Sequence, residues 1–287
     1  MSIQLIDVSY IYGSDTPMPV RALDHINLEI PKGQFIGIIG HTGSGKSTLI
    51  QMLNGLLKPG SGQVLFDSRD IWSDGYPIRE LRFKAGLVFQ YPEHQLFEEN
   101  VLKDICFGPK NKGLSDEDAL KAARDAMALV NLPEKYEKYS PFELSGGEKR
   151  RVAIAGVLAM DPDFLILDEP TAGLDPEGRD EILSEIARLQ KAKGMTVILV
   201  SHSMEDVAVY AGRLIVMDAG QIRFDASPRE VFTHRSSLEA MGLSVPQITD
   251  LADKLGQKGF YIPKDIITVQ EAKEAILKEL KKRGRLS

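Results

Sequence analysis

The sequence predicts an α/β fold built around a parallel β-sheet. Three short apolar runs, residues 35–39, 163–167 and 196–200, have the length of buried strands. The first run leads into a second apolar stretch at 49–57, which predicts a helix. Strands that alternate with helices are typical of parallel sheets. Ligands in such folds bind at the carboxyl ends of the strands, so the residues that follow each run are candidates for chemistry.

A glycine-rich loop follows the first run and fits the pattern G-x-x-x-x-G-K-S/T of a phosphate-binding loop, or P-loop. Its residues are Gly40, His41, Thr42, Gly43, Ser44, Gly45, Lys46, Ser47 and Thr48. Glycines let successive backbone N–H groups face phosphate oxygens, and the helix that begins here adds the positive end of its dipole. We expect Lys46 to reach the β- and γ-phosphates and the Ser47 hydroxyl to bind Mg²⁺. The alternative, a glycine-rich turn with an exposed lysine, leaves the agreement of all fixed positions unexplained.

Two carboxylates, Asp168 and Glu169, come directly after the second apolar run. At the carboxyl end of a central strand, Asp168 is expected to hold Mg²⁺, directly or through water. Glu169 is expected to orient and deprotonate the water that attacks the γ-phosphate. On its own, an Asp-Glu pair after an apolar run would indicate a solvated strand end. Beside a P-loop, it indicates nucleotide hydrolysis.

The segment Leu144-Ser145-Gly146-Gly147-Glu148 precedes a helix-like run that ends near residue 160. Ser145 and Glu148 form an S-x-x-E capping box, so the segment can be read as a simple helix start. Two glycines in the first turn weaken a helix by about 1 kcal/mol each relative to alanine. That cost favours a second interpretation, in which bare backbone is approached closely by an anion such as a γ-phosphate.

The P-loop, the LSGGE segment and the ILDEP segment, in this order, resemble the nucleotide-binding subunit of ATP-binding cassette (ABC) transporters over residues 3–226. The resemblance implies a P-loop NTPase fold of the ABC type, with a helical subdomain at about 100–160, and ATP and Mg²⁺ as cofactors. In this family ATP lies between two subunits, and the P-loop of one faces the LSGG segment of the other. Ser145, Gly146 and Gly147 would therefore serve the nucleotide of a second ATPase subunit, either identical or related.

The resemblance assigns further residues one at a time. Tyr12 matches the aromatic residue that stacks on adenine; Tyr10 is the competing candidate, and strand pairing is the alternative role for either. Gln90 matches the glutamine that touches Mg²⁺ and the attacking water. Asp175 matches the aspartate that contacts the opposite subunit, and His202 matches the switch histidine that contacts the γ-phosphate.

The chain departs from the usual family pattern at one position. Many relatives read LSGGQ, whereas Glu148 follows the two glycines here. Because Glu148 keeps the geometry of a capping box, we expect activity to survive.

Composition limits the other functions open to the chain. With 287 residues, 43% hydrophobic and 26% charged, it is long enough for one large domain and an appendage. We expect an ABC nucleotide-binding domain at 1–234 and a C-terminal extension at 235–287. The net charge of −6 argues against a broad nucleic-acid footprint. No apolar run approaches the roughly 20 residues of a spanning helix, and residues 1–20 lack the features of a signal peptide.

The extension closes with a predicted helix that the capping box Thr268–Glu271 opens and that runs to about Lys282. Its apolar stripe consists of Val269, Ala272, Ile276 and Leu280. Such a stripe needs a surface to bury. That surface is either the core of this chain or the matching extension of a second ATPase subunit, which would give the extension a role in dimerisation.

Weaker features point to one type of ABC ATPase. Residues 40–48 with 53–59, 88–97 and 152–160 resemble the ATPases of energy-coupling factor (ECF) transporters, and the loop 13–21 favours the second of two ATPase types. The resemblance implies a subunit at the cytoplasmic face of the membrane that powers uptake of a vitamin or transition metal. Its partners would be a second ATPase subunit, a transmembrane coupling subunit and a small membrane protein that captures substrate. The alternatives are the ATPase of another ABC importer and a soluble ABC-type switch ATPase.

Overall fold

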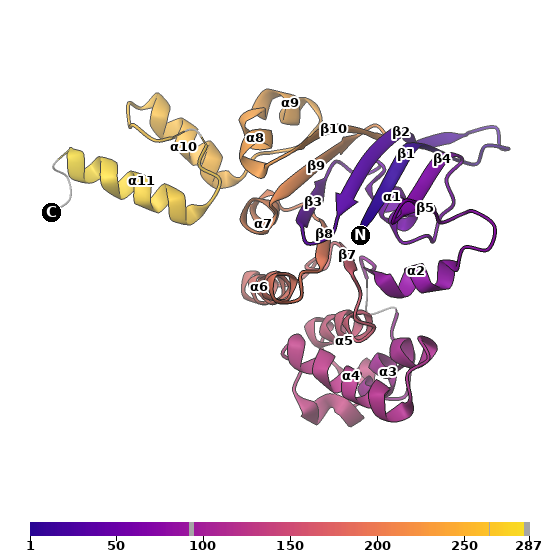
Figure 1. Ribbon diagram of the computed structural model, residues 1–287. Coiled ribbons are helices and arrows are strands. Elements are labelled where there is room, and N and C mark those ends of the chain that lie inside the picture. Colours follow the sequence, from indigo (N-terminus) through magenta and orange to yellow (C-terminus); the bar gives the residue numbers. More distant parts are fainter. Residues whose placement is uncertain (92–94, 264, 284–287) are drawn as a thin grey trace.

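A six-stranded sheet forms the centre of the computed structural model, which describes residues 1–91, 95–263 and 265–283 (Figure 1). The strand order is β10-β9-β3-β8-β7-β6, and all neighbours are parallel except β9 and β10. The strands are β3 (Phe35–Ile39), β6 (Ala85–Val88), β7 (Phe164–Asp168), β8 (Thr196–Val200), β9 (Arg213–Asp218) and β10 (Gln221–Ala226). The three predicted strands are therefore confirmed, with the second shifted by one residue.

A second sheet has four strands in the order β2-β1-β4-β5, and its neighbours are antiparallel. Its strands are β1 (Ser2–Tyr12), β2 (Val20–Pro31), β4 (Ser61–Phe66) and β5 (Arg69–Asp70). Strand β1 extends further than the apolar pattern suggests, because the ladder with β2 continues through register shifts until Tyr12 pairs with Val20. The backbones of Tyr10 and Tyr12 thus both take part in strand pairing.

Helices surround the two sheets. They are α1 (Lys46–Leu53), α2 (Ile78–Lys84), α3 (Val101–Asn111), α4 (Asp116–Leu129), α5 (Gly146–Leu158), α6 (Pro176–Lys193), α7 (Met204–Tyr210), α8 (Pro228–Thr233), α9 (Arg235–Ala240), α10 (Gln247–Gln257) and α11 (Val269–Lys282). Side-chain caps fix several starts: Ser115 accepts the Asp118 N–H at α4, and Thr268 and Glu271 cap each other at α11. The start of α11 agrees with the capping box that the sequence predicts at Thr268–Glu271.

The central sheet is buried on both faces, as its near-continuous apolar strands require. One cluster joins α1 to both sheets, and includes Leu49 of α1 and Ile166 of β7. The other cluster joins the alternate strand residues, such as Leu165, to α6 and to the helices α3, α4 and α5. Those three helices form a separate group in Figure 1, in the range where a helical subdomain is expected.

The C-terminal extension has two parts that pack differently. Leu238, Leu243 and Val245 belong to the same apolar cluster as Ile39 of β3 and Val207 of α7. Helices α10 and α11 instead lie to one side of the sheet and share a small cluster that includes Ala252 and Ala272 (Figure 1). A boundary after residue 234 stays a prediction, because apolar packing is continuous across that point up to about residue 245.

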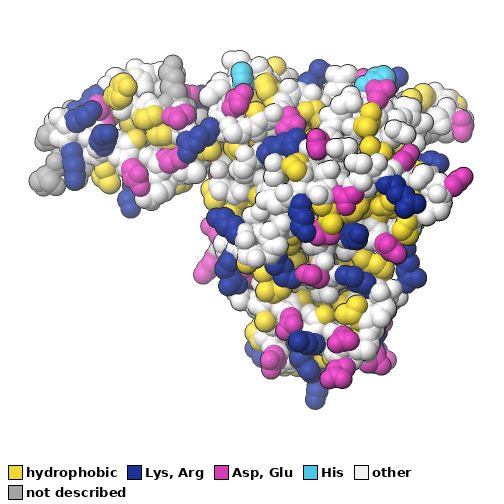
Figure 2. Space-filling model, in the orientation of Figure 1, with side chains coloured by type: hydrophobic (Ala, Val, Ile, Leu, Met, Phe, Trp, Pro, Cys, Tyr) yellow, Lys and Arg dark blue, Asp and Glu magenta, His cyan; other side chains and the backbone are white. Residues whose placement is uncertain are grey.

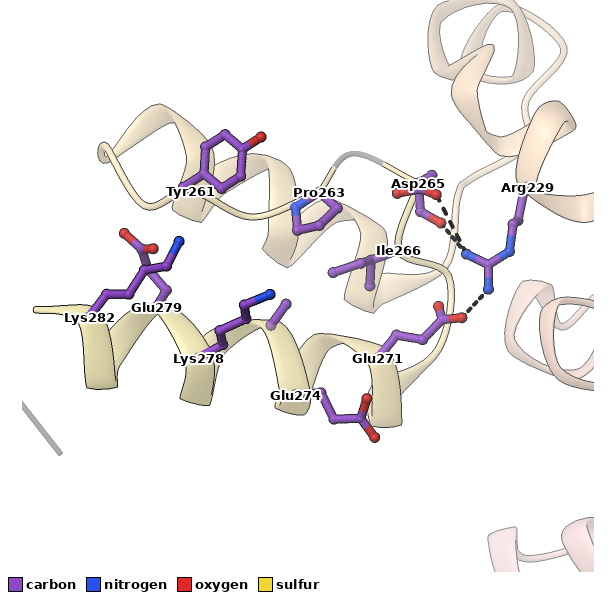
Figure 3. A pocket seen from close by; sticks show the side chains of 11 residues that line it. Arg229, Tyr261, Pro263, Asp265, Ile266, Glu271, Glu274, Lys278, Glu279 and Lys282 are labelled. Carbon is purple, nitrogen blue, oxygen red and sulfur yellow. Dashed lines mark hydrogen bonds and ion pairs between the residues drawn. The ribbon is translucent and has the colours of Figure 1, made fainter. Parts of the chain in front are cut away.

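The apolar stripe of α11 is divided between buried and exposed residues. Ala272 is buried and Ile276 packs against the small cluster, whereas Val269 is 71% exposed. Figure 3 shows how the start of α11 is attached, with Glu271 and Asp265 both directed toward Arg229 of α8. The chain therefore covers part of the stripe itself and leaves Val269 for another contact.

Charged side chains of both signs are interspersed on the face shown in Figure 2, without a continuous basic stripe on that face. None of the helices that the structure describes is long and apolar enough to cross a membrane.

Candidate functional site

The predicted site residues follow three neighbouring parallel strands. Strands β3, β8 and β7 lie side by side, so their carboxyl ends meet at one edge of the sheet. The P-loop follows β3, Asp168 ends β7, and His202 comes shortly after β8. The backbone also joins the ends directly, because the Glu169 N–H donates to the Val200 carbonyl over 3.0 Å.

Close packing explains two glycines of the P-loop. Gly45 has a φ of +103°, and a Cβ there would lie 2.4 Å from the Ala22 carbonyl oxygen. A Cβ on Gly40 would lie 2.4 Å from the Met217 carbonyl oxygen. A side chain at either position would collide with backbone, so the loop can turn into α1 only with glycine there.

Lys46 begins helix α1 and is buried at the mouth of the loop. Its ammonium donates to the carbonyl oxygens of Gly40 (2.7 Å) and His41 (3.0 Å). Burial lowers the pKa of Lys46, and the charges of Glu169 and Asp168 oppose that shift. The Ser44 hydroxyl is buried and finds no hydrogen-bond partner among the described residues. A buried donor without a partner, in the same loop as a buried ammonium, fits a loop that takes a phosphate oxygen at this point.

Asp168 lies beside the P-loop helix, with Oδ2 3.5 Å from the Ser47 hydroxyl. Burial raises the pKa of Asp168 and the Glu169 charge raises it further, while Lys46 and Ser47 act in the opposite direction. The described residues contain no group of three or more His, Cys, Asp or Glu side chains that could hold a metal ion. A hydroxyl and one carboxylate fit Mg²⁺, which is usually held by one or two carboxylates together with water and phosphate oxygens.

Glu169 is the point at which three predicted residues meet. Its Oε1 lies 2.8 Å from Nε2 of His202, and its Oε2 accepts a hydrogen bond from the Gln90 amide over 3.2 Å. The backbone of Glu169 has a φ of +48°, in the left-handed region that costs a non-glycine residue about 1–3 kcal/mol. The strand end thus holds a carboxylate in a strained but fully supported position, between an amide and an imidazole.

Tyr12 and Tyr10 have different environments. Tyr10 packs partly into the core, whereas Tyr12 is 43% exposed. The Tyr12 hydroxyl lies 3.3 Å from Oγ1 of Thr48, and its ring meets the ring of Tyr10 edge-on at 4.8 Å between centroids. Of the two candidates, Tyr12 presents the exposed ring beside the P-loop helix.

The imidazole of His41 connects the P-loop to strand β9. Its Nε2 lies 3.1 Å from Oδ1 of Asp218, and its Nδ1 lies 2.7 Å from the carbonyl oxygen of Thr42. Sequence reasoning missed Asp218, because an aspartate at the end of β9 carries no motif.

The structure does not bring the LSGG segment to the P-loop. Ser145 caps α5 in the group of helices that lies apart from α1 (Figure 1). Asp175 is exposed and caps α6, where its Oδ1 accepts the Gly178 N–H over 2.8 Å. A Cβ on Gly146 would meet no described atom within 4 Å, so packing within the described chain does not require glycine there. These residues face outward while the other predicted residues gather at the sheet edge.

The family described as ABC transporter matches residues 23–172, which is more than half of the chain. The chain therefore belongs to the ABC transporter family. Within it, the chain is 56% identical over 279 residues, or 97% of both sequences, to the energy-coupling factor transporter ATP-binding protein EcfA2 of Clostridium tetani. The EcfA2 protein of Enterococcus faecalis is 50% identical over 99% of both chains. The similarity of the chain to these proteins over nearly its full length thus places the chain with the ATP-binding proteins of ECF transporters.

Solved structures agree with this grouping. The chain resembles cbiO1 of Clostridium perfringens, part of the ABC transporter complex cbiONQ, with a TM-score of 0.74 and 39% identity over 88% of this chain and 98% of that one. It also resembles the cassette MJ0796, solved as a dimer in a post-hydrolysis state bound to ADP and phosphate, with a TM-score of 0.72 and 28% identity over 79% of this chain and 98% of that one.

Proposed function

We propose that this chain is the ATP-binding and hydrolysing subunit that powers uptake through an energy-coupling factor transporter. One observation carries the proposal. Lys46, Asp168 and Glu169 converge at one sheet edge, while the LSGG segment faces outward on a separate group of helices. Each chain thus holds the P-loop half of a site and, apart from it, the LSGG segment at residues 144–147, which we call the signature side. Two subunits are therefore needed to build a full site.

ATP with Mg²⁺ supplies the phosphoryl group whose transfer to water drives the cycle. The buried ammonium of Lys46 and the orphaned Ser44 hydroxyl would bind its phosphates, and Ser47 with Asp168 would hold the metal. Glu169 would take the proton of the attacking water, held in place by Gln90 and His202. Tyr12 would stack on the base.

The signature side fits a nucleotide that another subunit holds. Gly146 and Gly147 leave backbone amides bare at the start of α5, and the space beside Gly146 is open in the described chain. Helix N-termini with exposed amides bind anions. We therefore assign Ser145, Gly146 and Gly147 to the phosphates in the partner ATPase, and Asp175 to contacts across the same interface. The dimeric form in which MJ0796 was solved supports this arrangement.

A membrane partner fits a groove of about 300 Å³ that helices α2, α3 and α5 and residues 95–97 line. Phe97 is 56% exposed and Phe107 is 47% exposed at its edge, and their rings meet edge-on at 4.8 Å. Exposed aromatic patches of this kind mark protein interfaces. The family resemblance implies a hinge of the helical subdomain at residues 90–97, of which residues 92–94 lie outside the described residues. We assign this groove to a transmembrane coupling subunit, which would hold the chain at the cytoplasmic face of the membrane.

The names of the curated relatives support the ECF type, because eight relatives at 50–56% identity are all called energy-coupling factor transporter ATP-binding protein EcfA2. We infer that this chain is the second ATPase type, that it pairs with a further ATPase subunit, and that a small membrane protein captures the substrate. The experiment is purification of the tagged chain from its own cells in mild detergent. A coupling subunit without a small capture protein would leave the ATPase assignment standing and overturn the ECF type.

A second experiment, in the purified complex, tests whether each nucleotide lies between the P-loop of one subunit and the LSGG segment of the other. Lys46→Ala should abolish photolabelling of this chain by azido-ATP, because it removes the ammonium from the phosphates. Ser145→Arg should spare that labelling and suppress hydrolysis at the nucleotide of the partner. If Ser145→Arg removed labelling of this chain and left the partner site working, the assignment of the signature side would be wrong.

A further inference from the structure

In this structure Glu148 forms hydrogen bonds with both the hydroxyl and the backbone N–H of Ser145. The Ser145 hydroxyl donates to Oε2 of Glu148 over 2.7 Å, and the Ser145 backbone N–H donates to the same oxygen over 2.8 Å. In return the hydroxyl oxygen accepts the Glu148 N–H at 3.4 Å. The hydroxyl proton is therefore directed at a carboxylate of its own helix, and not outward.

The carboxylate is anchored by further groups. A hydrogen bond from the Tyr136 hydroxyl is the largest cause that lowers the pKa of Glu148, followed by the bond from Ser145, with Lys135 adding a weaker attraction. Tyr136 is itself held, because it packs against the core and its ring meets Tyr139 edge-on at 5.3 Å. A depressed pKa keeps Glu148 ionised at neutral pH, so a fixed negative charge lies in the first turn of α5.

That charge stabilises the helix but opposes a second anion at the same place. A carboxylate near a helix N-terminus is favourable because it faces the positive end of the dipole. A phosphate that approaches the same amides meets a like charge and a hydroxyl whose proton is already donated. A glutamine has the same shape, and its one amide oxygen can accept both bonds from Ser145 without the charge.

We propose that Glu148 is a positioning residue that holds Ser145 in its own capping box and weakens the contact between this signature side and the γ-phosphate held by the partner subunit. The inference rests on the proposed function, because it needs a partner nucleotide at Ser145. Glu148 thereby sets the ATP concentration at which the two ATPase subunits close.

Glu148→Gln in the detergent-purified complex tests the proposal. The ATP concentration that half-saturates labelling and hydrolysis at the site facing Ser145 should fall by about threefold or more, since removal of one charge near a helix N-terminus changes an anion contact by this order. The thermal midpoint of unfolding should stay the same or fall slightly, because the helix loses a favourable charge. A residue that only capped the helix would give no change in half-saturation.

The chain provides a matched control in Glu143. It is the third residue of the neighbouring capping box, where its carboxylate accepts the Ser140 N–H over 3.3 Å. Glu143→Gln removes the same charge five positions away and should leave half-saturation unchanged. A similar fall in both variants would mean that the overall charge of the chain, not the charge beside Ser145, is responsible, and would overturn the proposal.

Ionic strength gives a second readout. Between about 0.05 M and 0.5 M salt the ratio of half-saturating ATP concentrations in wild type and Glu148→Gln should shrink, because salt screens partly exposed charges. A ratio that did not change with salt would contradict a role for the charge. If the wild-type complex showed no ATP-dependent closure at all, the proposed function would fail, whereas closure with equal values in both proteins would overturn only the role of Glu148.

Discussion

Glu169 occupies its position because of backbone contacts as well as side-chain chemistry. Its N–H is tied to Val200 on the neighbouring strand, and its left-handed backbone turns the side chain toward Gln90 and His202. Strain at one residue persists only where the surroundings fix it, as they do here on both sides. The position of the carboxylate therefore depends on two strand ends, and an isosteric change should leave it in place.

Glu169→Gln should leave ATP binding intact and slow hydrolysis by about 10²–10⁴-fold, because the amide cannot take a proton from water. The amide can still bond to His202, so the fold of the strand end is kept. Phosphate release by the purified complex, measured beside nucleotide binding, checks both halves of the expectation. Hydrolysis at the wild-type rate would exclude Glu169 as the base.

Tyr12→Ala should weaken ATP binding by about fivefold to a hundredfold, since stacking of a base on an aromatic ring contributes roughly 1–3 kcal/mol. Tyr12→Phe is the control, because it keeps the ring and loses only the hydroxyl near Thr48. Titration with a fluorescent ATP analogue separates the two. Equal affinities in wild type and Tyr12→Ala would exclude Tyr12 as the stacking residue and favour Tyr10.

At the scale of elements, the start of α5 combines weak helix formers with a strong cap. Ser145 and Glu148 supply a complete capping box, while Gly146 and Gly147 reduce the stability of the same turn. The two effects oppose each other, and nothing packed beside Gly146 in the described chain requires the glycine. The first turn of the helix is therefore less stable than the same capped turn would be without the two glycines. This is expected where a ligand needs access to bare amides.

Gly146→Ala should raise the stability of this chain by about 1 kcal/mol, because alanine is the better helix former and its Cβ has space. The thermal midpoint should rise by about 2 °C. At the same time hydrolysis at the partner nucleotide should fall, because the new methyl group stands where a phosphate would approach. Calorimetry on the isolated chain and turnover by the complex give the two values. A variant that was more stable and fully active would show that nothing approaches Gly146.

Sequence patterns identified the elements that obey local rules. The apolar runs located β3, β7 and β8, and the capping box at Thr268 located the start of α11. The meeting of Gln90, Glu169 and His202 depends on the order of strands in the sheet, which a single sequence does not contain. It was expected only through the family resemblance. The extent of β1 and the bond between His41 and Asp218 depend on partners distant in sequence, and no local pattern indicates them.

At the scale of the molecule, the extension combines a structural part and an outlying part. Residues up to about 245 complete the core beside α7, whereas α10 and α11 form their own small cluster. Salt bridges from Arg235 to Asp250 and Asp253 attach α10 to the rest of the extension. The exposed Val269 lies on the outlying part and is available for the matching extension of another subunit. That arrangement would keep the second half-site at high effective concentration while the ATP faces are open.

A chain that ends at Pro246 should fold and bind ATP but pair poorly with its ATPase partner in nucleotide-free buffer. The cut keeps Leu238, Leu243 and Val245, so the core beside β3 loses only Ile267. Val269→Asp is the matched point variant, because an acidic residue in the first turn of α11 favours the helix and removes only the apolar contact. Light scattering measures pairing. Pairing equal to that of the full chain in both variants would exclude the extension as a dimer contact.

The cluster that joins β3 to the extension also bears on how the chain is made. Ile39, the last residue of the strand before the P-loop, belongs to the same apolar cluster as Val231, Leu243 and Val245. A ribosome adds roughly 5–20 residues each second, so at least about ten seconds pass between the synthesis of this strand and that of residues 231–245. During that time its apolar face is open to other proteins. The nucleotide-binding end of the sheet is thus among the last regions to become fully packed during synthesis, although its strand is among the first to emerge.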